Sequence, residues 1–155
     1  MSENELFRTA LAKAMAQCAR RECCINDVRT KLDTWGLGDS ESKKIINLMI
    51  RENFINEERF ARSFVKDKIN YNKWGKLKIA AHLKAKRVPG DIIQKALDSI
   101  DNEHYTKTLN VLLSKHRLSV KATDQFDLKA KLLRFGLSRG FESTLLYDLL
   151  NDFED

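Results

Sequence analysis

Apolar residues recur at helical spacing through most of the chain, and short polar or glycine-containing stretches separate the runs. In residues 56–68, Phe60 and Phe64 lie one turn apart on one face, whereas Arg59, Arg62 and Lys66 fall on another, because a helix repeats every 3.6 residues. One face is therefore suited to a protein core, and the other to water or a partner.

The same periodicity predicts an all-α protein. A single proline, Pro89, and six glycines stand between the helical runs rather than at the close spacing of hairpins. Asn56 precedes Glu57 and Glu58, and Thr123 precedes Asp124, as residues that cap helices precede an acidic first turn. We expect helices at residues 5–20, 25–35, 40–52, 57–70, 75–86, 90–100, 102–116, 124–138 and 142–152.

Three stretches of the chain align without gaps. They begin at Gly36, Arg87 and Gly140, at intervals of 51 and then 53 residues. In each, an apolar residue follows directly, and apolar residues recur nine, ten and thirteen positions after the Gly or Arg. A three-helix unit of this size is too small to close a large core alone, so neighbours should stack end to end. We therefore predict an elongated, curved array of three tandem three-helix repeats, at residues 1–55, 56–100 and 101–155.

Two features depart from the repeat. Glu41 and Ser42 occupy positions where Ile92 and Ile93 stand in the middle repeat, which predicts that the third helix of the first repeat starts late or packs loosely. Gly136 interrupts a helix of the third repeat, where an interior glycine costs about 1 kcal/mol relative to alanine. It predicts either a bend or a close contact between helices.

Positive charge is concentrated in the middle of the chain. The net charge is +6 and the pI is about 9.3. Residues 1–55 contribute +1, residues 56–87 contribute +7, and residues 88–155 contribute −2. The middle segment therefore carries the whole excess, and it suggests an anionic partner.

The basic side chains of this segment are our candidate contacts. Lysine and arginine at this density can neutralise phosphates and release counterions, which gives binding that is salt-dependent and largely independent of base sequence. The alternative is a solvated helix face without a partner. The candidates are Arg59, Arg62, Lys66, Lys68, Lys73, Lys76, Lys78, Lys84, Lys86 and Arg87.

Two aromatic residues, Tyr71 and Trp74, lie in the turn between the two groups of cations. They could stack on bases or hold two helices together, and we expect the second role for both. A short glycine-containing turn also gives each repeat some likeness to a helix-turn-helix. The third helix of the middle repeat offers few side chains able to read base edges, so we do not expect recognition of a specific DNA sequence.

The sequence gives no sign of a membrane protein, a disulfide framework or a zinc site. No run approaches the roughly 18 apolar residues that span a bilayer, and charges occur throughout the first 21 residues, where a signal peptide needs an apolar stretch. We expect a cytoplasmic protein. Cys18, Cys23 and Cys24 are odd in number and clustered, so we expect reduced, structural thiols.

Nothing in the sequence indicates catalysis. His82, His104 and His116 are scattered, and neither a Ser-His-Asp grouping nor a glycine-rich phosphate loop occurs. The carboxylates stand where helix caps and surface pairs would put them. We therefore expect a protein that is not an enzyme and that has no cofactor and no metal.

A resemblance to a known family rests on longer segments. FINEERFARSFVKDKI and WGKLKIAAHLKAKRV at residues 54–69 and 74–88, with DVRTKLDTWGL and LLRFGLSRGF on either side, resemble the RecX family of bacterial recombination regulators. The likeness covers the chain from about Leu11 onward. EERFARSFV is its most distinctive part. The positions that match this motif are Glu58, Arg59, Phe60, Ala61, Phe64 and Val65.

The resemblance implies tandem three-helix repeats that lodge in the helical groove of the RecA filament on DNA. It also implies that the protein lowers ATP hydrolysis, strand exchange and coprotease activity by RecA, in DNA recombination, DNA repair and the SOS response. Members of the family also bind DNA by themselves. The charge distribution agrees with this, because a groove that contains nucleic acid favours a long, partly cationic ligand.

Our first hypothesis is therefore a regulator that binds the RecA filament. The second is a general nucleic-acid-binding protein, bound mostly to phosphates of single- or double-stranded DNA, without a dedicated RecA partner. A third is a helical scaffold for an unrelated protein. We expect a monomer, because a repeat protein buries its own interfaces.

Overall fold

The computed structural model describes residues 2–152, and within them the chain forms nine α-helices, one π-helical turn and no strand. All nine predicted helices are present, and their ends lie within two residues of the prediction except at residues 57–70, where the α-helix stops early and continues as the π-helical turn η1. The elements are α1 (Glu3–Arg20), α2 (Ile25–Thr34), α3 (Asp39–Arg51), α4 (Glu57–Asp67), η1 (Lys68–Asn72), α5 (Lys76–Ala85), α6 (Gly90–Asp98), α7 (Asn102–Arg117), α8 (Gln125–Ser138) and α9 (Ser143–Asn151).

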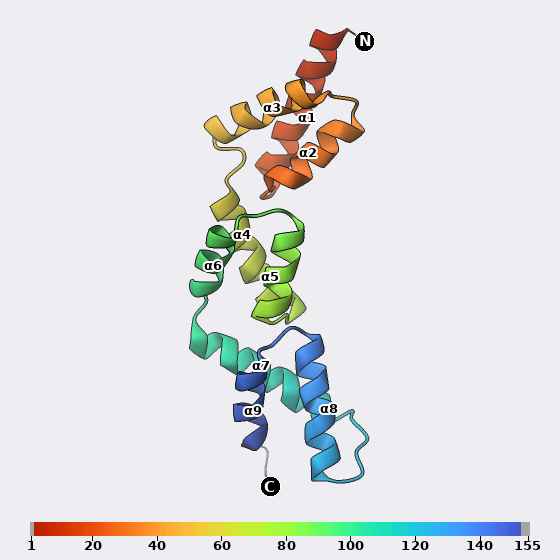
Figure 1. Cartoon of the computed structure of the whole chain (residues 1–155), viewed down its shortest axis with the longest axis vertical. Helices are drawn as coiled ribbons and strands as arrows, with labels where there is room; N and C mark the ends of the chain where they lie inside the picture. Colours follow the sequence, from red (N-terminus) through yellow and green to blue (C-terminus); the bar gives the residue numbers. More distant parts are fainter. Residues whose placement is uncertain (1, 153–155) are drawn as a thin grey trace.

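The helices follow one another in threes along the long axis of the molecule. In Figure 1 the groups α1–α3, α4–α6 and α7–α9 succeed each other from the N-terminal to the C-terminal end. This confirms the predicted fold class, an elongated and curved all-α array of three-helix repeats. The division into domains at residues 1–55, 56–100 and 101–155 stays a prediction.

A common helix stop explains the spacing of the repeat. The residues that open the three aligned stretches, Gly36, Arg87 and Gly140, adopt left-handed conformations with φ of +90°, +61° and +91°. In each case the next backbone N–H donates a hydrogen bond of 3.1 Å to the carbonyl oxygen five residues earlier, and the apolar side chain that follows is buried. This is the Schellman geometry that ends a helix. The apolar residue is carried into the core as the chain turns.

The apolar core has two parts. Helices α1–α3 enclose their own cluster, around Leu32, Ile45 and Met49. The middle and third repeats share a second, continuous cluster, which includes Phe60 and Val65 of the motif. The middle repeat is therefore joined to the third by extensive apolar burial, and to the first by the buried side chain of Cys24 and by polar contacts.

The middle and third repeats approach each other most closely at two glycines. The backbone N–H of Gly75 donates to the carbonyl oxygen of Arg139 at 2.7 Å, and that of Leu77 donates to the carbonyl oxygen of Gly140 at 3.0 Å. A Cβ atom on Gly75 would lie 2.3 Å from backbone atoms of Gly140 and Phe141. No side chain fits there, so the start of α5 rests directly on the turn between α8 and α9.

Tyr105 of α7 contacts both sides of this junction. Its hydroxyl donates a short hydrogen bond to the carboxylate of Glu142 and accepts one from the backbone N–H of Lys76 at 2.9 Å. Its ring lies 5.4 Å from that of Phe141. Burial, with the bond to Glu142, raises the pKa of Tyr105, so the phenol keeps its proton and remains a donor.

The structure decides both departures from the repeat. α3 begins at Asp39 and Ser42 is buried at 5% exposure, so the prediction of a late or loosely packed helix was wrong; the small serine side chain fits a buried position. α8 is continuous through Gly136. A Cβ atom there would lie 2.3 Å from the side chain of Leu146, so this glycine allows a close contact between α8 and α9 rather than a bend.

We predict that Gly75→Ala destabilises the protein by about 1–3 kcal/mol, because the added methyl group meets backbone that has no room to move. Urea denaturation of the full chain measures this change. Gly90→Ala is the control, because nothing lies within 4 Å of its Cβ position and alanine favours helix. It should be neutral or stabilising by up to about 1 kcal/mol, and equal effects of the two substitutions would contradict the close approach.

Candidate functional site

The ten predicted basic residues do not share one surface. Some join the middle repeat to the first, some surround aromatic rings, and some project into solvent. The charge that could reach an anionic partner therefore belongs to part of the predicted set.

Arg59 is used to hold α4 against the first repeat. Asn56 caps α4 by accepting a hydrogen bond from the backbone N–H of Arg59 at 3.0 Å, and this fixes the start of the helix. The Nε atom of Arg59 then lies 2.6 Å from Oε2 of Glu22, and Nη2 donates to the carbonyl oxygen of Asn53 at 3.1 Å. The guanidinium is therefore neutralised inside the molecule.

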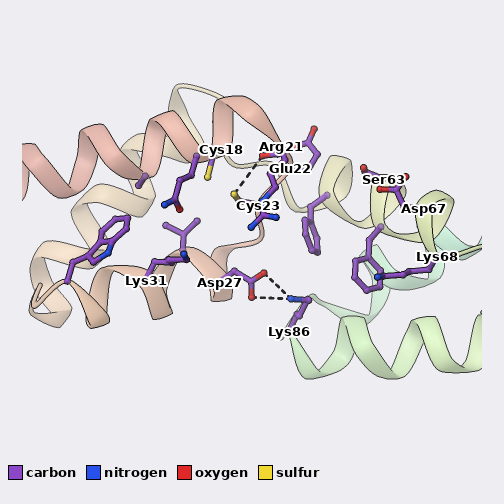
Figure 2. Close-up of a pocket in the computed structure, with 16 residues that line it drawn as sticks. Cys18, Arg21, Glu22, Cys23, Asp27, Lys31, Ser63, Asp67, Lys68 and Lys86 are labelled. Atoms are coloured by element: carbon purple, nitrogen blue, oxygen red, sulfur yellow. Dashed lines mark hydrogen bonds and ion pairs between the residues drawn. The ribbon is translucent and has the colours of Figure 1, made fainter. Parts of the chain in front are cut away.

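Lys86 and Glu57 make two further bridges to the first repeat. Figure 2 shows Lys86 reaching across to Asp27, with Nζ 2.9 Å from Oδ2. The carboxylate of Glu57 accepts a hydrogen bond of 2.7 Å from the backbone N–H of Ile25, at the start of α2. Burial of Glu57 raises its pKa. With Arg59, these groups form the polar clamp between the first and middle repeats.

A cleft of about 340 Å³ lies beside the polar clamp, between α1–α2 and α4–η1. Cys18, Cys23, Trp35 and Phe64 are among the side chains that line it. The three cysteines are free thiols. Burial raises the pKa of Cys18 to about 12, so its thiol is neutral at pH 7.

Cys24 links the first repeat to the core of the other two. Its Sγ atom accepts a hydrogen bond from the backbone N–H of Asp27 at 3.4 Å and so caps α2. The side chain is fully buried and belongs to the cluster shared by the middle and third repeats. Burial raises its pKa to about 11.

Trp74 ties η1 to α5. Its ring lies between the ammonium groups of Lys68 and Lys78, at 4.9 and 4.8 Å from the ring centroid, and 4.4 Å from the ring of His82. Cations over an aromatic face are attracted to it. The expected role of Trp74 in holding two helices together is confirmed.

The same expectation was wrong for Tyr71, which is 82% exposed. η1 places Ile69 in the core, and a residue two positions further along a helical turn faces nearly the opposite way. Tyr71 is therefore open to solvent and available for stacking on a ligand.

Lys76 and Lys73 have local partners. The ammonium of Lys76 lies 4.7 Å from the ring centroid of Tyr105. Lys73 has a left-handed backbone, with φ of +56°, and its ammonium donates to the carbonyl oxygen of Asn70. Neither has a carboxylate partner among residues 2–152, so both positive charges remain uncompensated.

The remaining candidates, Arg62, Lys66, Lys84 and Arg87, are exposed. The Nη1 atom of Arg62 lies 4.0 Å from Glu58, at the limit of an ion pair, and the other three have no ion-pair partner in the part of the chain that the structure describes. Fewer cations therefore face solvent than the charge of residues 56–87 suggests, because Arg59 and Lys86 pair with carboxylates in the polar clamp.

Neither a cluster of metal ligands nor a membrane-spanning helix occurs in the described part of the chain. Within residues 2–152, no three His, Cys, Asp or Glu side chains are grouped so as to hold a metal ion. None of the helices there is long and apolar enough to cross a membrane.

Comparisons with known proteins agree on one family. A family model described as the second three-helix domain of RecX matches residues 56–97. The chain is 30% identical over 147 residues to "Regulatory protein RecX" of Clostridium botulinum strain Alaska E43, covering 94% of this chain and 67% of that protein. It is 28% identical over 152 residues to the protein of that name from Prosthecochloris aestuarii, covering 98% and 97%.

Length and fold complete the comparison. Against the "Regulatory protein RecX" of C. botulinum strain Eklund 17B, the identity is 32% over 127 residues, and the match spans 81% of this chain but 59% of that protein. The crystal structure of RecX from Lactobacillus salivarius has the same fold, with a TM-score of 0.83 at 19% identity, covering 96% of this chain and 97% of that one.

We expect Arg59→Ala to lower the free energy of unfolding by about 1 kcal/mol, because it leaves Glu22 without its partner at the junction. Arg62→Ala is the matched control, since it removes an arginine of the same helix whose ion pair, to Glu58 within α4, is at the distance limit of 4.0 Å, and it should change stability by less than about 0.5 kcal/mol. Urea denaturation of both variants checks this. Equal losses would mean that the contact between Arg59 and Glu22 adds no stability.

The raised pKa of Glu57 predicts a pH dependence. The folded state binds this proton more tightly than the unfolded state, so the contribution of Glu57 to stability is greatest at low pH and declines as pH rises through its raised pKa. Glu57→Gln keeps an oxygen acceptor for Ile25 without the charge, and should stabilise the protein at pH 7. Thermal unfolding from pH 3 to pH 7 should show this gain vanishing toward pH 3; a gain that is independent of pH would contradict the shift.

Proposed function

This chain belongs to the RecX family, and on that basis we propose that it is a non-enzymatic regulator of the RecA recombinase. In this proposal it binds the RecA–DNA filament in its helical groove and lowers ATP hydrolysis, strand exchange and coprotease activity. It thereby modulates recombination and DNA repair.

The shape of the molecule supports groove binding. Three repeats in line expose long helix surfaces along one axis (Figure 1), and a groove ligand has to follow a filament past more than one protomer. Modest contacts from several repeats act together, because the first contact raises the effective concentration of the next. A ligand that bridges neighbouring protomers restrains the rearrangements that hydrolysis and strand exchange require.

One observation carries the electrostatic part of the proposal. Arg62, Lys66, Lys84 and Arg87 project into solvent, whereas Arg59 and Lys86 are neutralised within the molecule. The exposed group is suited to phosphates or to acidic side chains that line a groove containing DNA.

A general nucleic-acid-binding protein is the second candidate, favoured by the same exposed cations. It differs from the first in its dependence on salt. Binding through phosphates alone weakens steeply as salt rises, whereas a filament regulator acts on RecA at salt concentrations where the isolated protein hardly binds DNA.

We predict that the natural protein, added in substoichiometric amounts, inhibits the single-stranded-DNA-dependent ATPase of RecA. Arg62→Glu with Lys66→Glu should raise the half-inhibitory concentration by about tenfold or more, equivalent to about 1.4 kcal/mol. Lys43→Glu with Lys44→Glu, two exposed lysines on α3, reverses the same number of charges and should change it much less. Circular dichroism checks that both variants fold.

Absence of inhibition at every ratio, with DNA binding still measurable, would overturn the regulator and leave a general nucleic-acid-binding protein. Equal weakening by both double variants would show that net charge matters and the α4 surface does not.

A further inference from the structure

A groove that runs from the middle repeat along α7 of the third repeat was not among the predicted sites. It consists of three adjoining hollows of about 540, 440 and 260 Å³. The first lies between α4, η1 and the start of α7, and it shares His104 with the second. The second and third share Val111 and Lys115. We call these three neighbouring hollows the α7 groove.

The sequence of α7 builds one wall of the groove. His104, Lys107, Val111 and Lys115 fall at positions i, i+3, i+7 and i+11, which share one helix face. The other face of α7 is buried in the core of the middle and third repeats. The repeat architecture therefore fixes which face α7 presents to solvent.

The α7 groove has an apolar floor and a positive rim. Val65, Ile69, Ile100 and Leu112 line it with apolar atoms and are buried or half-buried. The basic side chains along it come from α4, the segment after η1, and α7. The cations are Arg62, Lys66, Lys73, Lys107 and Lys115, and the imidazole of His104 lies among them with its Nε2 atom 2.9 Å from Oδ1 of Asn70.

These charges have little compensation. Among the described residues that line the three hollows, Asp101 alone is acidic, and its carboxylate already accepts a hydrogen bond from the backbone N–H of Glu103 at 3.1 Å. Lys66, Lys107 and Lys115 have no carboxylate within ion-pair distance in residues 2–152. The α7 groove is therefore suited to an anion.

An exposed aromatic residue lies between two groove-lining residues along the chain. Asn70 lines the first hollow and Lys73 lines the second, and Tyr71 lies between them. Its ring has no stacking partner among the described residues. Single-stranded nucleic acids are bound by positive grooves with aromatic side chains on which bases stack.

We propose that the α7 groove binds a single strand of nucleic acid. Its phosphates lie along the positive rim, its sugars and base edges cover the apolar floor, and a base stacks on Tyr71. An acidic protein segment would use the same cations but would leave the tyrosine without a role. This proposal rests on the proposed function in one respect, because Arg62 and Lys66 belong to both binding surfaces. Its test requires no RecA.

The first test measures binding of a fluorescent oligothymidylate to the full chain by anisotropy. Lys107→Ala with Lys115→Ala should weaken binding by about 10- to 30-fold at about 0.1 M salt, and should reduce the slope of log K against log salt by about 1.4, because each lost contact to a single strand removes about 0.7. Lys43→Ala with Lys44→Ala is the control with equal loss of charge. It should leave the slope nearly unchanged.

The second test isolates stacking. Tyr71→Leu should weaken binding by roughly 5- to 100-fold, whereas Tyr71→Phe should retain it, because a base stacks on either aromatic ring. Circular dichroism of these exposed-site variants checks the fold.

Three outcomes would overturn the site. The first is that the Lys107→Ala, Lys115→Ala variant binds the oligonucleotide as well as the α3 control does, and the second is that Tyr71→Leu and Tyr71→Phe bind it equally. The third is that the Lys107→Ala, Lys115→Ala variant still binds the oligonucleotide but no longer binds polyglutamate. The last would assign the groove to an acidic protein segment. Whether the chain regulates RecA is tested separately, by measuring inhibition of the RecA ATPase by the natural protein. Failure of the regulator and failure of the α7 groove are therefore distinguishable.

Discussion

The close approach of two backbone segments at Gly75 and Gly140 determines how the middle and third repeats fit together. Hydrogen bonds from α5 reach the turn between α8 and α9 only because neither glycine has a side chain. The hydroxyl of Tyr105 accepts a hydrogen bond from the backbone N–H of Lys76 and donates one to Glu142. The buried apolar side chains of the two repeats form a single cluster. The position of α7 beside α4 and η1, and hence the α7 groove, follows from this arrangement.

Positive charge in the middle repeat has two separate uses. Arg59 and Lys86 face carboxylates of the first repeat and hold the chain together, while Arg62 and Lys66, on the same stretch of sequence, face solvent. Residues three positions apart on one helix can therefore differ in role, because only one of them meets a neighbour. An accumulation of charge in a sequence is thus an upper bound on the charge that a partner meets.

The sequence was sufficient for the helices and their grouping, because apolar periodicity and helix stops are local. The repeat of Gly36, Arg87 and Gly140 followed from the need for a left-handed residue at each stop. Partners distant in sequence were not predictable: nothing local distinguishes Arg59, paired with Glu22, from Arg62. The spacing of His104, Lys107 and Lys115 places them on one helix face, which the sequence alone could have shown. A charge sum over residues 88–155 does not reveal this basic face, because acidic residues elsewhere bring the net charge to −2.

The two junctions of the molecule respond differently to their surroundings. One is formed by backbone and buried apolar surface, which dissolved ions hardly affect. The other is formed chiefly by partly exposed ion pairs, which mobile ions screen. We therefore expect a rise in ionic strength to weaken the contact between the first and middle repeats while the middle and third repeats keep their packing.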